Sequence, residues 1–252
     1  MNAVSMPSAA AAGASHCLDG RRIVITGAAS GIGKATARMF AAAGAKLTLL
    51  DRDLNGLSEF AEVPGIGSFQ ADVTDEQAVA SAVAQGAATM GGIDGVVNCA
   101  GIMVGGSVLE IDVAQWRRVL DINLTGAYIV VRSCLPWLQK SVGATIVNVG
   151  SGQSLLPNAP RRTAYASSKG GVLNLTRALA AELAPGIRAN TVCPGLVDTP
   201  MASGMHANAR NYALQRLAQP DEIARAILFL TSSDSSYVTG AALAVDGGRS
   251  FH

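Results

Sequence analysis

The sequence predicts a doubly wound α/β fold, in which helices cover both faces of a parallel sheet. Three observations support this fold class. Strand and helix patterns alternate strictly, several strands are apolar throughout, and the connections are short. Hydrophobic residues make up 49% of the chain, which is enough for a large core. No linker-like stretch divides residues 18–252, so we expect one domain.

The first half of the chain carries four predicted strands and two helices. The strands cover residues 22–26 (RIVIT), 45–51 (AKLTLLD), 66–72 (IGSFQAD) and 94–101 (DGVVNCAG). A helix is predicted over residues 34–44, where Gly44 takes the C-cap position. A second helix is predicted over residues 75–90, because acidic side chains in its first turn complement the helix dipole.

The second half continues the alternation. A long helical pattern runs from Val113 to Lys140, with a break expected near Pro136. A helix that contains Tyr165 runs to about Leu183. The remaining elements are strands over residues 144–150, 187–195 and 242–248, and a helix over residues 221–232.

Composition excludes several functional classes. The net charge of +1 gives no strong attraction to nucleic acid or to an anionic membrane, and no apolar run reaches the length of a membrane span. The four cysteines (Cys17, Cys99, Cys134 and Cys193) are far apart, which is typical of reduced thiols in a cytoplasmic protein. They form no metal-ligand pattern with the three histidines. Residues 1–17 are small and low in complexity, without the features of a secretory signal, so we expect a disordered tail.

A glycine-rich segment, TGAASGIG (26–33), lies between the first strand and the first helix. Glycines at such a turn permit tight bending and close approach of a pyrophosphate, and the helix N-terminus favours an anion. The spacing departs from G-x-G-x-x-G, so an ordinary strand-to-helix turn is the alternative. Asp51 ends the second strand, where a carboxylate can accept hydrogen bonds from an adenosine ribose. The alternative for Asp51 is a solvated turn residue.

A tyrosine and a lysine stand four residues apart in RRTAYASSKGG (161–171). Side chains at this spacing share one face of a helix, so the Tyr165 phenol and the Lys169 ammonium would lie side by side. This arrangement suits an acid held beside its activator, because a nearby ammonium lowers the pKa of a phenol. The plainer alternative is a solvated lysine beside a half-buried tyrosine.

Four motifs occur in order on the predicted elements. They are Thr26-Gly27-x-x-x-Gly31-Ile32-Gly33, Asn98-x-Ala100-Gly101, Tyr165-x-x-x-Lys169 and Pro194-Gly195. On these residues the chain resembles the single-domain short-chain dehydrogenase/reductases, from about Leu18 to Gly248. The resemblance implies a seven-stranded Rossmann-fold sheet, a nicotinamide cofactor and a homotetramer.

The resemblance assigns catalytic roles by position. It implies a catalytic set of Asn123, Ser151, Tyr165 and Lys169. Tyr165 would be the general acid/base, Ser151 would bind the substrate oxygen, and Lys169 would tune Tyr165 and hold the nicotinamide ribose. Asn123 would hold a water of the proton relay. Gly150 departs from a frequent serine, which leaves Ser154 as a second candidate for the serine role.

The resemblance also implies a cofactor site. Its residues would be Gly27, Ser30, Gly31, Ile32, Gly33, Asp51, Arg52, Asp72, Val73, Asn98, Ala100, Gly101, Tyr165, Lys169, Pro194, Gly195, Val197 and Thr199. Cys99 replaces a more frequent asparagine in this pattern. Asp51 favours NAD over NADP, because a 2′-phosphate would bring a like charge close to it. Arg52 has the opposite influence, and we expect Asp51 to prevail.

These features predict an NAD(H)-dependent oxidoreductase that acts on a small secondary alcohol or ketone. The alternative is a non-catalytic protein that senses the cofactor, which an incomplete catalytic set would favour. A methyltransferase-like fold leaves the Tyr–Lys pair unexplained. A zinc alcohol dehydrogenase needs a Cys/His ligand set, and the sequence shows none.

Residues 199–219 should form a partly apolar lid over the substrate. Arg161 and Arg162 either attract an anionic substrate or lie in solvent or at a subunit contact.

Overall fold

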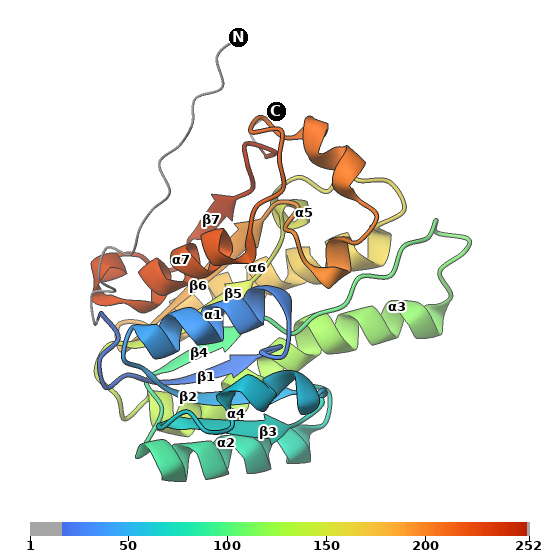
Figure 1. The fold of residues 1–252 in the computed structure, drawn as a ribbon. Helices are drawn as coiled ribbons and strands as arrows, with labels where there is room; N and C mark the ends of the chain where they lie inside the picture. Colours follow the sequence, from blue (N-terminus) through green and yellow to red (C-terminus); the bar gives the residue numbers. More distant parts are fainter. Residues whose placement is uncertain (1–16, 251–252) are drawn as a thin grey trace.

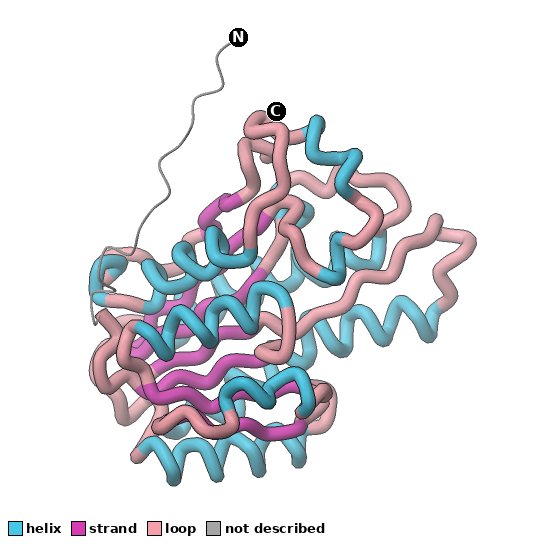
Figure 2. The backbone as a smooth tube through the Cα atoms, viewed as in Figure 1, coloured by secondary structure: helices cyan, strands magenta, loops and turns pink. Residues whose placement is uncertain are grey.

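A seven-stranded parallel sheet forms the centre of the molecule (Figures 1 and 2). The computed structural model describes residues 17–250, without the side chains of residues 206–208, so the tail expected over residues 1–17 lies almost wholly outside it. The strands are β1 (Arg22–Thr26), β2 (Lys46–Asp51), β3 (Ile66–Gln70), β4 (Gly95–Asn98), β5 (Ala144–Val149), β6 (Ile187–Pro194) and β7 (Ala242–Val245). Their order is β3-β2-β1-β4-β5-β6-β7, and every pair is parallel. The predicted fold class is confirmed.

Helices cover both faces of this sheet (Figure 1). One face carries α1 (Gly31–Ala42), the 3-10 helix η1 (Asn55–Phe60) and α7 (Pro220–Thr231), and the other carries α2 (Glu76–Met90), α4 (Gly126–Leu138) and α6 (Thr163–Leu183). Successive strand side chains point to opposite faces, so Ile23 and Ile25 join the first core and Val24 joins the second. Burial on both faces explains why the strands are apolar throughout.

Local signals account for the helix boundaries. The Asp75 carboxylate accepts hydrogen bonds from the backbone N–H groups of Gln77 and Ala78, both at 3.0 Å, and so caps α2. Gly91 ends this helix in the left-handed conformation, at φ 80°. Gly44 follows α1 with a φ of 89°, at the place where the sequence predicted a glycine cap.

The long helix predicted from Val113 to Lys140 is interrupted at a different place. It consists of α3 (Val113–Leu120), a π-helical turn (Asp121–Thr125) and α4. The break expected near Pro136 is wrong, because α4 runs through Pro136 to Leu138. Pro136 lies in the last turn of α4, so only two helical residues follow it. Asn123 lies on the π-helical turn, an irregularity that is frequent at functional sites.

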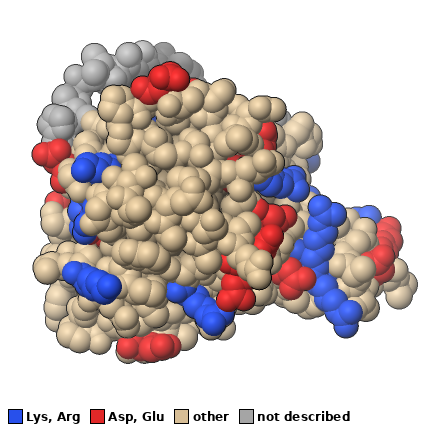
Figure 3. Space-filling model, turned by 90° about the horizontal axis from the view of Figure 1, so that it is seen from below, with Lys and Arg blue, Asp and Glu red and all other residues tan. Residues whose placement is uncertain are grey.

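The surface carries charges of both signs. Figure 3 shows Lys and Arg side chains interspersed with Asp and Glu on the face seen from below. This distribution accompanies a net charge of +1. Within residues 17–250, no helix combines the length and the hydropathy needed to cross a membrane.

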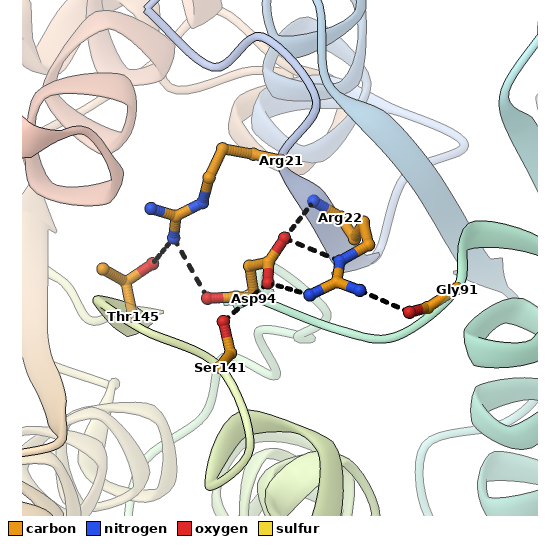
Figure 4. A network of polar contacts seen from close by, with 6 residues as sticks. All are labelled: Arg21, Arg22, Gly91, Asp94, Ser141 and Thr145. Carbon is orange, nitrogen blue, oxygen red and sulfur yellow. Dashed lines mark hydrogen bonds and ion pairs between the residues drawn. The ribbon is translucent and has the colours of Figure 1, made fainter.

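A partly buried ion pair joins the amino-terminal ends of β1, β4 and β5 (Figure 4). The Asp94 carboxylate lies 2.5 Å from Arg22 Nη2 and accepts further hydrogen bonds from Arg22 Nε at 2.8 Å and Ser141 Oγ at 2.6 Å. Burial raises the pKa of Asp94, but the hydrogen bonds from Arg22 and Ser141 outweigh it and lower the pKa to about 2. The network fixes the amino-terminal ends of these strands, whereas the predicted site lies at their carboxyl ends.

Replacing Asp94 by Asn should lower the free energy of unfolding at pH 7 by about 2 kcal/mol. A depressed carboxyl pKa stabilises the fold fully above the unfolded-state value of about 4, and this stabilisation is lost as the pH falls through about 2. The difference between wild type and Asp94→Asn should therefore shrink between about pH 4 and 2 in urea titrations.

Glu76→Gln is the matched control for this prediction. Arg132 and Glu76 form an ion pair whose side chains are 60% and 59% exposed, so breaking it should cost less than about 1 kcal/mol. The role given to Asp94 would be contradicted if both variants lost the same free energy of unfolding. It would also be contradicted if the stability difference between wild type and Asp94→Asn did not change with pH.

Candidate active site

Two adjoining hollows lie beyond the carboxyl ends of the strands, next to β1 and β4, where the strand order reverses. The first, about 240 Å³, is lined among others by Gly27, Ser30, Gly31, Ile32, Gly33, Asp51, Arg52, Asp72, Val73, Ala100, Gly101 and Thr199. The second, about 490 Å³, is lined among others by Ser151, Tyr165, Lys169, Pro194, Gly195, Val197 and Thr199. The hollows share Ile32, Cys99, Gly101, Thr199 and Met201. The structure thus brings together all of the predicted site residues except Asn98 and Asn123.

The glycine-rich segment is packed too tightly for side chains. A Cβ atom on Gly33 would lie 2.1 Å from the carbonyl oxygen of Gly27, and one on Gly27 would lie 2.7 Å from the backbone nitrogen of Ala100. Gly27 also has a φ of 67°, in the left-handed region that favours glycine. The Thr26 hydroxyl accepts a hydrogen bond from the Ala100 N–H at 3.2 Å, which ties the end of β1 to the segment after β4.

The amino-terminal end of α1 borders the first hollow. Ser30 is the N-cap residue, yet its side chain makes no capping hydrogen bond, and the first turn contains no acidic residue. The N–H groups of this turn therefore have no capping side chain, and the helix dipole favours an anion at this end. The tight glycine turn and the uncapped helix start fit the pyrophosphate of a dinucleotide.

Asp51 is held in a fixed position on the rim of the first hollow. Its Oδ2 accepts a hydrogen bond from Ala29 N and its Oδ1 accepts one from Asp53 N, both at 3.0 Å. Each carboxylate oxygen has a second lone pair, so Asp51 can still accept hydrogen bonds from ribose hydroxyls. Arg52 is exposed and lines the same hollow. Lys34 lies close by in the chain, but its ammonium is 3.3 Å from Glu59 and donates to Gly56 O at 3.2 Å.

Asn98 lines neither hollow. Its side chain is buried and donates hydrogen bonds to Asn148 Oδ1 at 2.9 Å and to Ala127 O at 3.4 Å. Asn148 continues this chain of contacts to the Thr176 hydroxyl at 2.8 Å. The Asn98 side chain therefore steadies the sheet and α4, and it is the neighbouring Ala100 and Gly101 that reach the hollow.

Asn123 is also buried outside the hollows. Its amide accepts a hydrogen bond from Ile102 N at 2.8 Å and donates to Ile102 O and Ser168 Oγ, both at 2.9 Å. A Cβ atom on Gly101 would lie 3.2 Å from Asn123 Oδ1 and 3.4 Å from Lys169 Nζ. A side chain at Gly101 would therefore enter the space beside the amide and the lysine, and the π-helical turn places Asn123 where it fixes the segment after β4.

Ser151 and Tyr165 both line the second hollow, and the Ser151 hydroxyl lowers the pKa of Tyr165. Ser151 follows β5 and caps the short helix α5 (Gly152–Leu155), where its hydroxyl accepts from Gln153 N at 3.1 Å. The second candidate, Ser154, has a different role, because its hydroxyl accepts from Ser151 N at 3.1 Å and donates to Lys169 O at 2.7 Å. The geometry therefore favours Ser151 for the serine role. A Cβ atom on Gly150 would lie 2.8 Å from Thr191 Cγ2, which explains the glycine there.

Lys169 is buried beside the half-buried Tyr165. Its ammonium donates to Val149 O at 2.8 Å and lies 6.0 Å from the centroid of the Tyr165 ring. Burial lowers the pKa of Lys169 to about 8. Burial also raises the pKa of Tyr165 and outweighs the hydrogen bond from Ser151 and the positive charge of Arg162, which both lower it. Without cofactor the net shift of the Tyr165 pKa is therefore upward, whereas the Lys169 ammonium by itself is expected to lower that pKa.

The two arginines before Tyr165 differ in their surroundings. Arg161 is exposed and forms an ion pair with Glu110 at 2.8 Å, whereas Arg162 lines the second hollow.

Sequence reasoning missed Tyr212 and Arg249, which also line the second hollow. Arg249 follows β7, and the rule that parallel strands end at one edge could have placed it near the site. Among the described residues, no cluster of His, Cys, Asp and Glu is arranged to hold a metal ion.

Comparisons with known proteins agree with this geometry. Residues 27–250 match the family model described as "Enoyl-(Acyl carrier protein) reductase". A cis-4-hydroxycyclohexanecarboxylate dehydrogenase of Sinomonas cyclohexanicum is 42% identical over 90% of this chain and 96% of its own length.

Two similar solved structures are of proteins from Brucella melitensis. A short-chain dehydrogenase/reductase of the glucose/ribitol dehydrogenase type is 37% identical, with a TM-score of 0.87 over 92% of this chain and 97% of that one. A 3-ketoacyl-(acyl-carrier-protein) reductase complexed with NADH is 33% identical, with a TM-score of 0.88 over 92% of this chain and 99% of that one.

Gly33→Ala should lower the free energy of unfolding by about 1–3 kcal/mol, because the added methyl group collides with the Gly27 carbonyl. Gly170→Ala is the matched control. A Cβ atom there meets nothing within 4 Å, so alanine should stabilise α6 by up to about 1 kcal/mol. Thermal and urea unfolding of both variants measure the difference, and equal stability of the two would show that the glycine turn tolerates a side chain.

Proposed function

The chain belongs to the short-chain dehydrogenase/reductase family, and from this premise we propose that it is an NAD(H)-dependent oxidoreductase of secondary alcohols and ketones. One observation carries the proposal. The Tyr165 phenol and Ser151 line the second hollow beside the buried Lys169 ammonium, where this hollow meets the first one at the glycine turn. This arrangement joins a proton donor to a cofactor site.

The residues of the first hollow fit the adenosine and pyrophosphate parts of a dinucleotide. The glycine turn and the α1 N-terminus would hold the pyrophosphate, Asp51 the ribose, and Asp72 and Val73 the adenine. Thr199 lines both hollows, and with Val197 it would hold the nicotinamide carboxamide. The chemistry that bound nicotinamide supplies is transfer of the hydride.

Tyr165 and its neighbours would handle the proton. Ser151 would hydrogen-bond the substrate oxygen and keep it next to Tyr165 Oη. Since burial favours the neutral phenol, Tyr165 is ready to donate a proton to the oxygen of a ketone. In the reverse direction it would take the proton of the alcohol, and the Lys169 ammonium would stabilise the phenolate before that step. Lys169 would also hold the nicotinamide ribose.

A non-catalytic protein that senses the cofactor is the alternative. All four positions of the catalytic set, Asn123, Ser151, Tyr165 and Lys169, are filled, and the last three line one hollow. This completeness favours catalysis. The homotetramer and the cytoplasmic location stay predictions.

Tyr165→Phe should reduce kcat by roughly 10²–10⁴-fold, because it removes only the phenolic proton donor. Binding of NADH, followed by its fluorescence, should be retained. Tyr128→Phe is the matched control, since Tyr128 is 49% exposed on α4 and lies outside both hollows. The assignment fails if Tyr165→Phe keeps more than about half of the wild-type kcat when chemistry limits the rate.

NAD(H) should be preferred over NADP(H) by at least about tenfold in kcat/KM, or roughly 1.4 kcal/mol. Two like charges about 4 Å apart repel by about 4 kcal/mol at an effective dielectric constant of ~20, so Asp51 opposes a 2′-phosphate. The nearby Lys34 is paired with Glu59, which leaves Arg52 as the cation on that rim.

Kinetics with both cofactors and one substrate measure this preference. Asp51→Ser should move the kcat/KM ratio toward NADP(H). Asp53→Ser, two residues away and outside the first hollow, should leave the ratio unchanged. Equal use of the two cofactors by the wild type would show that Arg52 prevails.

A further inference from the structure

The second hollow has an unbalanced charge. Three cationic side chains line it, Arg162, Lys169 and Arg249, and no Asp or Glu occurs among its lining residues in the described part of the chain. The first hollow, in contrast, is lined by Asp51 and Asp72 beside Arg52. Lys169 already has an assigned role, so the two arginines are the unexplained charges.

The backbone fixes Arg162 in the hollow. The Gly106 N–H donates to Arg161 O at 3.0 Å, and Gly106 forms a β-bridge with Arg162. Arg161 has a φ of 61°, a left-handed conformation that is uncommon for a residue other than glycine. The loop therefore holds Arg161 in solvent and Arg162 toward the site.

The Arg162 guanidinium lacks an anionic partner. Its side-chain contact with an acceptor is to Met205 Sδ at 3.8 Å, and sulfur is a weak acceptor. Within residues 17–250, no carboxylate forms an ion pair with it. A half-buried charge without a counter-ion is unfavourable, so an anion in this hollow would gain a partner that the fold does not supply.

Arg249 approaches the same hollow from the segment after β7. Its guanidinium carbon lies over the Tyr212 ring, 5.5 Å from the ring centroid, and the guanidinium donates to Asn158 Oδ1 at 2.6 Å. These two contacts fix the side chain. A guanidinium has five N–H donors, so most of them remain for a ligand. The neighbouring Asp246 carboxylate is occupied by the backbone N–H groups of residues 248, 249 and 250 at 2.9–3.2 Å.

We propose that the substrate of this enzyme carries a carboxylate, which Arg162 and Arg249 bind, so that it is a hydroxy acid or the corresponding oxo acid. This inference rests on the proposed oxidoreductase function. Arg162 is the N-cap residue of α6, Tyr165 lies in the first turn of this helix, and both side chains line the second hollow. One small molecule can therefore place its hydroxyl at Tyr165 and its carboxylate at Arg162. The planar guanidinium matches a carboxylate with two parallel hydrogen bonds.

Matched substrate pairs test this inference. We would measure kcat/KM with NAD for 3-hydroxybutyrate and 4-hydroxypentanoate and for their primary amides, which have nearly the same shape and no charge. The wild type should prefer at least one acid over its amide by at least about tenfold, as expected for charge-assisted hydrogen bonds. Arg162→Met and Arg249→Met should each reduce this preference severalfold, and the double variant should abolish it.

The ratio of acid to amide is the decisive quantity. Arg162 also affects the pKa of Tyr165, but that effect acts on both members of a pair and cancels in the ratio. Arg161→Met is the matched control, because it removes the neighbouring charge without changing the hollow, and it should keep the wild-type ratio. If Arg162→Met does not fold, Arg162→Lys should still lower the ratio, because an ammonium lacks the two-pronged geometry.

Each outcome separates the inference from the proposed function. Equal turnover of acids and amides, or turnover of neutral secondary alcohols alone, would overturn the carboxylate proposal and leave the oxidoreductase function intact. A preference for the phosphate ester sn-glycerol 3-phosphate over all the acids would overturn the choice of carboxylate. Failure of every alcohol and ketone with either cofactor would instead count against the proposed function itself.

Discussion

The close packing of Gly33 against Gly27 sets the geometry on which the site depends. A Cβ atom on Gly33 would lie 2.1 Å from the Gly27 carbonyl oxygen, so the short turn from β1 to α1 can pack this closely only with glycine there. This contact places the uncapped N-terminus of α1 beside Ala100 and Gly101, at the reversal of strand order between β1 and β4. The hollow is therefore a consequence of backbone packing, and the polar side chains around it act within a frame that the glycines fix.

Desolvation shifts the pKa values of the proposed catalytic pair. Burial raises the pKa of Tyr165 and lowers that of Lys169 to about 8, so at pH 7 the phenol is neutral and Lys169 remains mostly a cation. Arg162 adds a positive charge that opposes this effect on the phenol. Cationic groups are thus preorganised where negative charge would develop on the reacting oxygen, and little reorganisation is needed when it does.

The sequence predicts the sheet and most of the site because its signals there are local. Apolar strand runs, the Asp75 cap and the tyrosine–lysine spacing each act within a few residues. Contacts between distant segments escape this reasoning. Asn123, on the π-helical turn, forms hydrogen bonds with Ile102 and Ser168, which are far away in the chain. The local pattern does not reveal these contacts, so the sequence predicts a break at Pro136 instead. Arg249 reaches the site only because β7 returns beside β6.

The two hollows satisfy their charges in different ways. The Asp51 carboxylate accepts hydrogen bonds from the backbone N–H groups of Ala29 and Asp53, so the fold itself stabilises that charge before any ligand arrives. The Arg162 guanidinium, in contrast, donates to no acceptor among the described residues other than the Met205 sulfur atom. A charge that the fold already stabilises can select between ligands by repulsion, as Asp51 would against a 2′-phosphate. A charge that the fold leaves without a counter-ion can select between ligands by attraction, because an anionic ligand supplies the missing counter-ion and a neutral ligand does not.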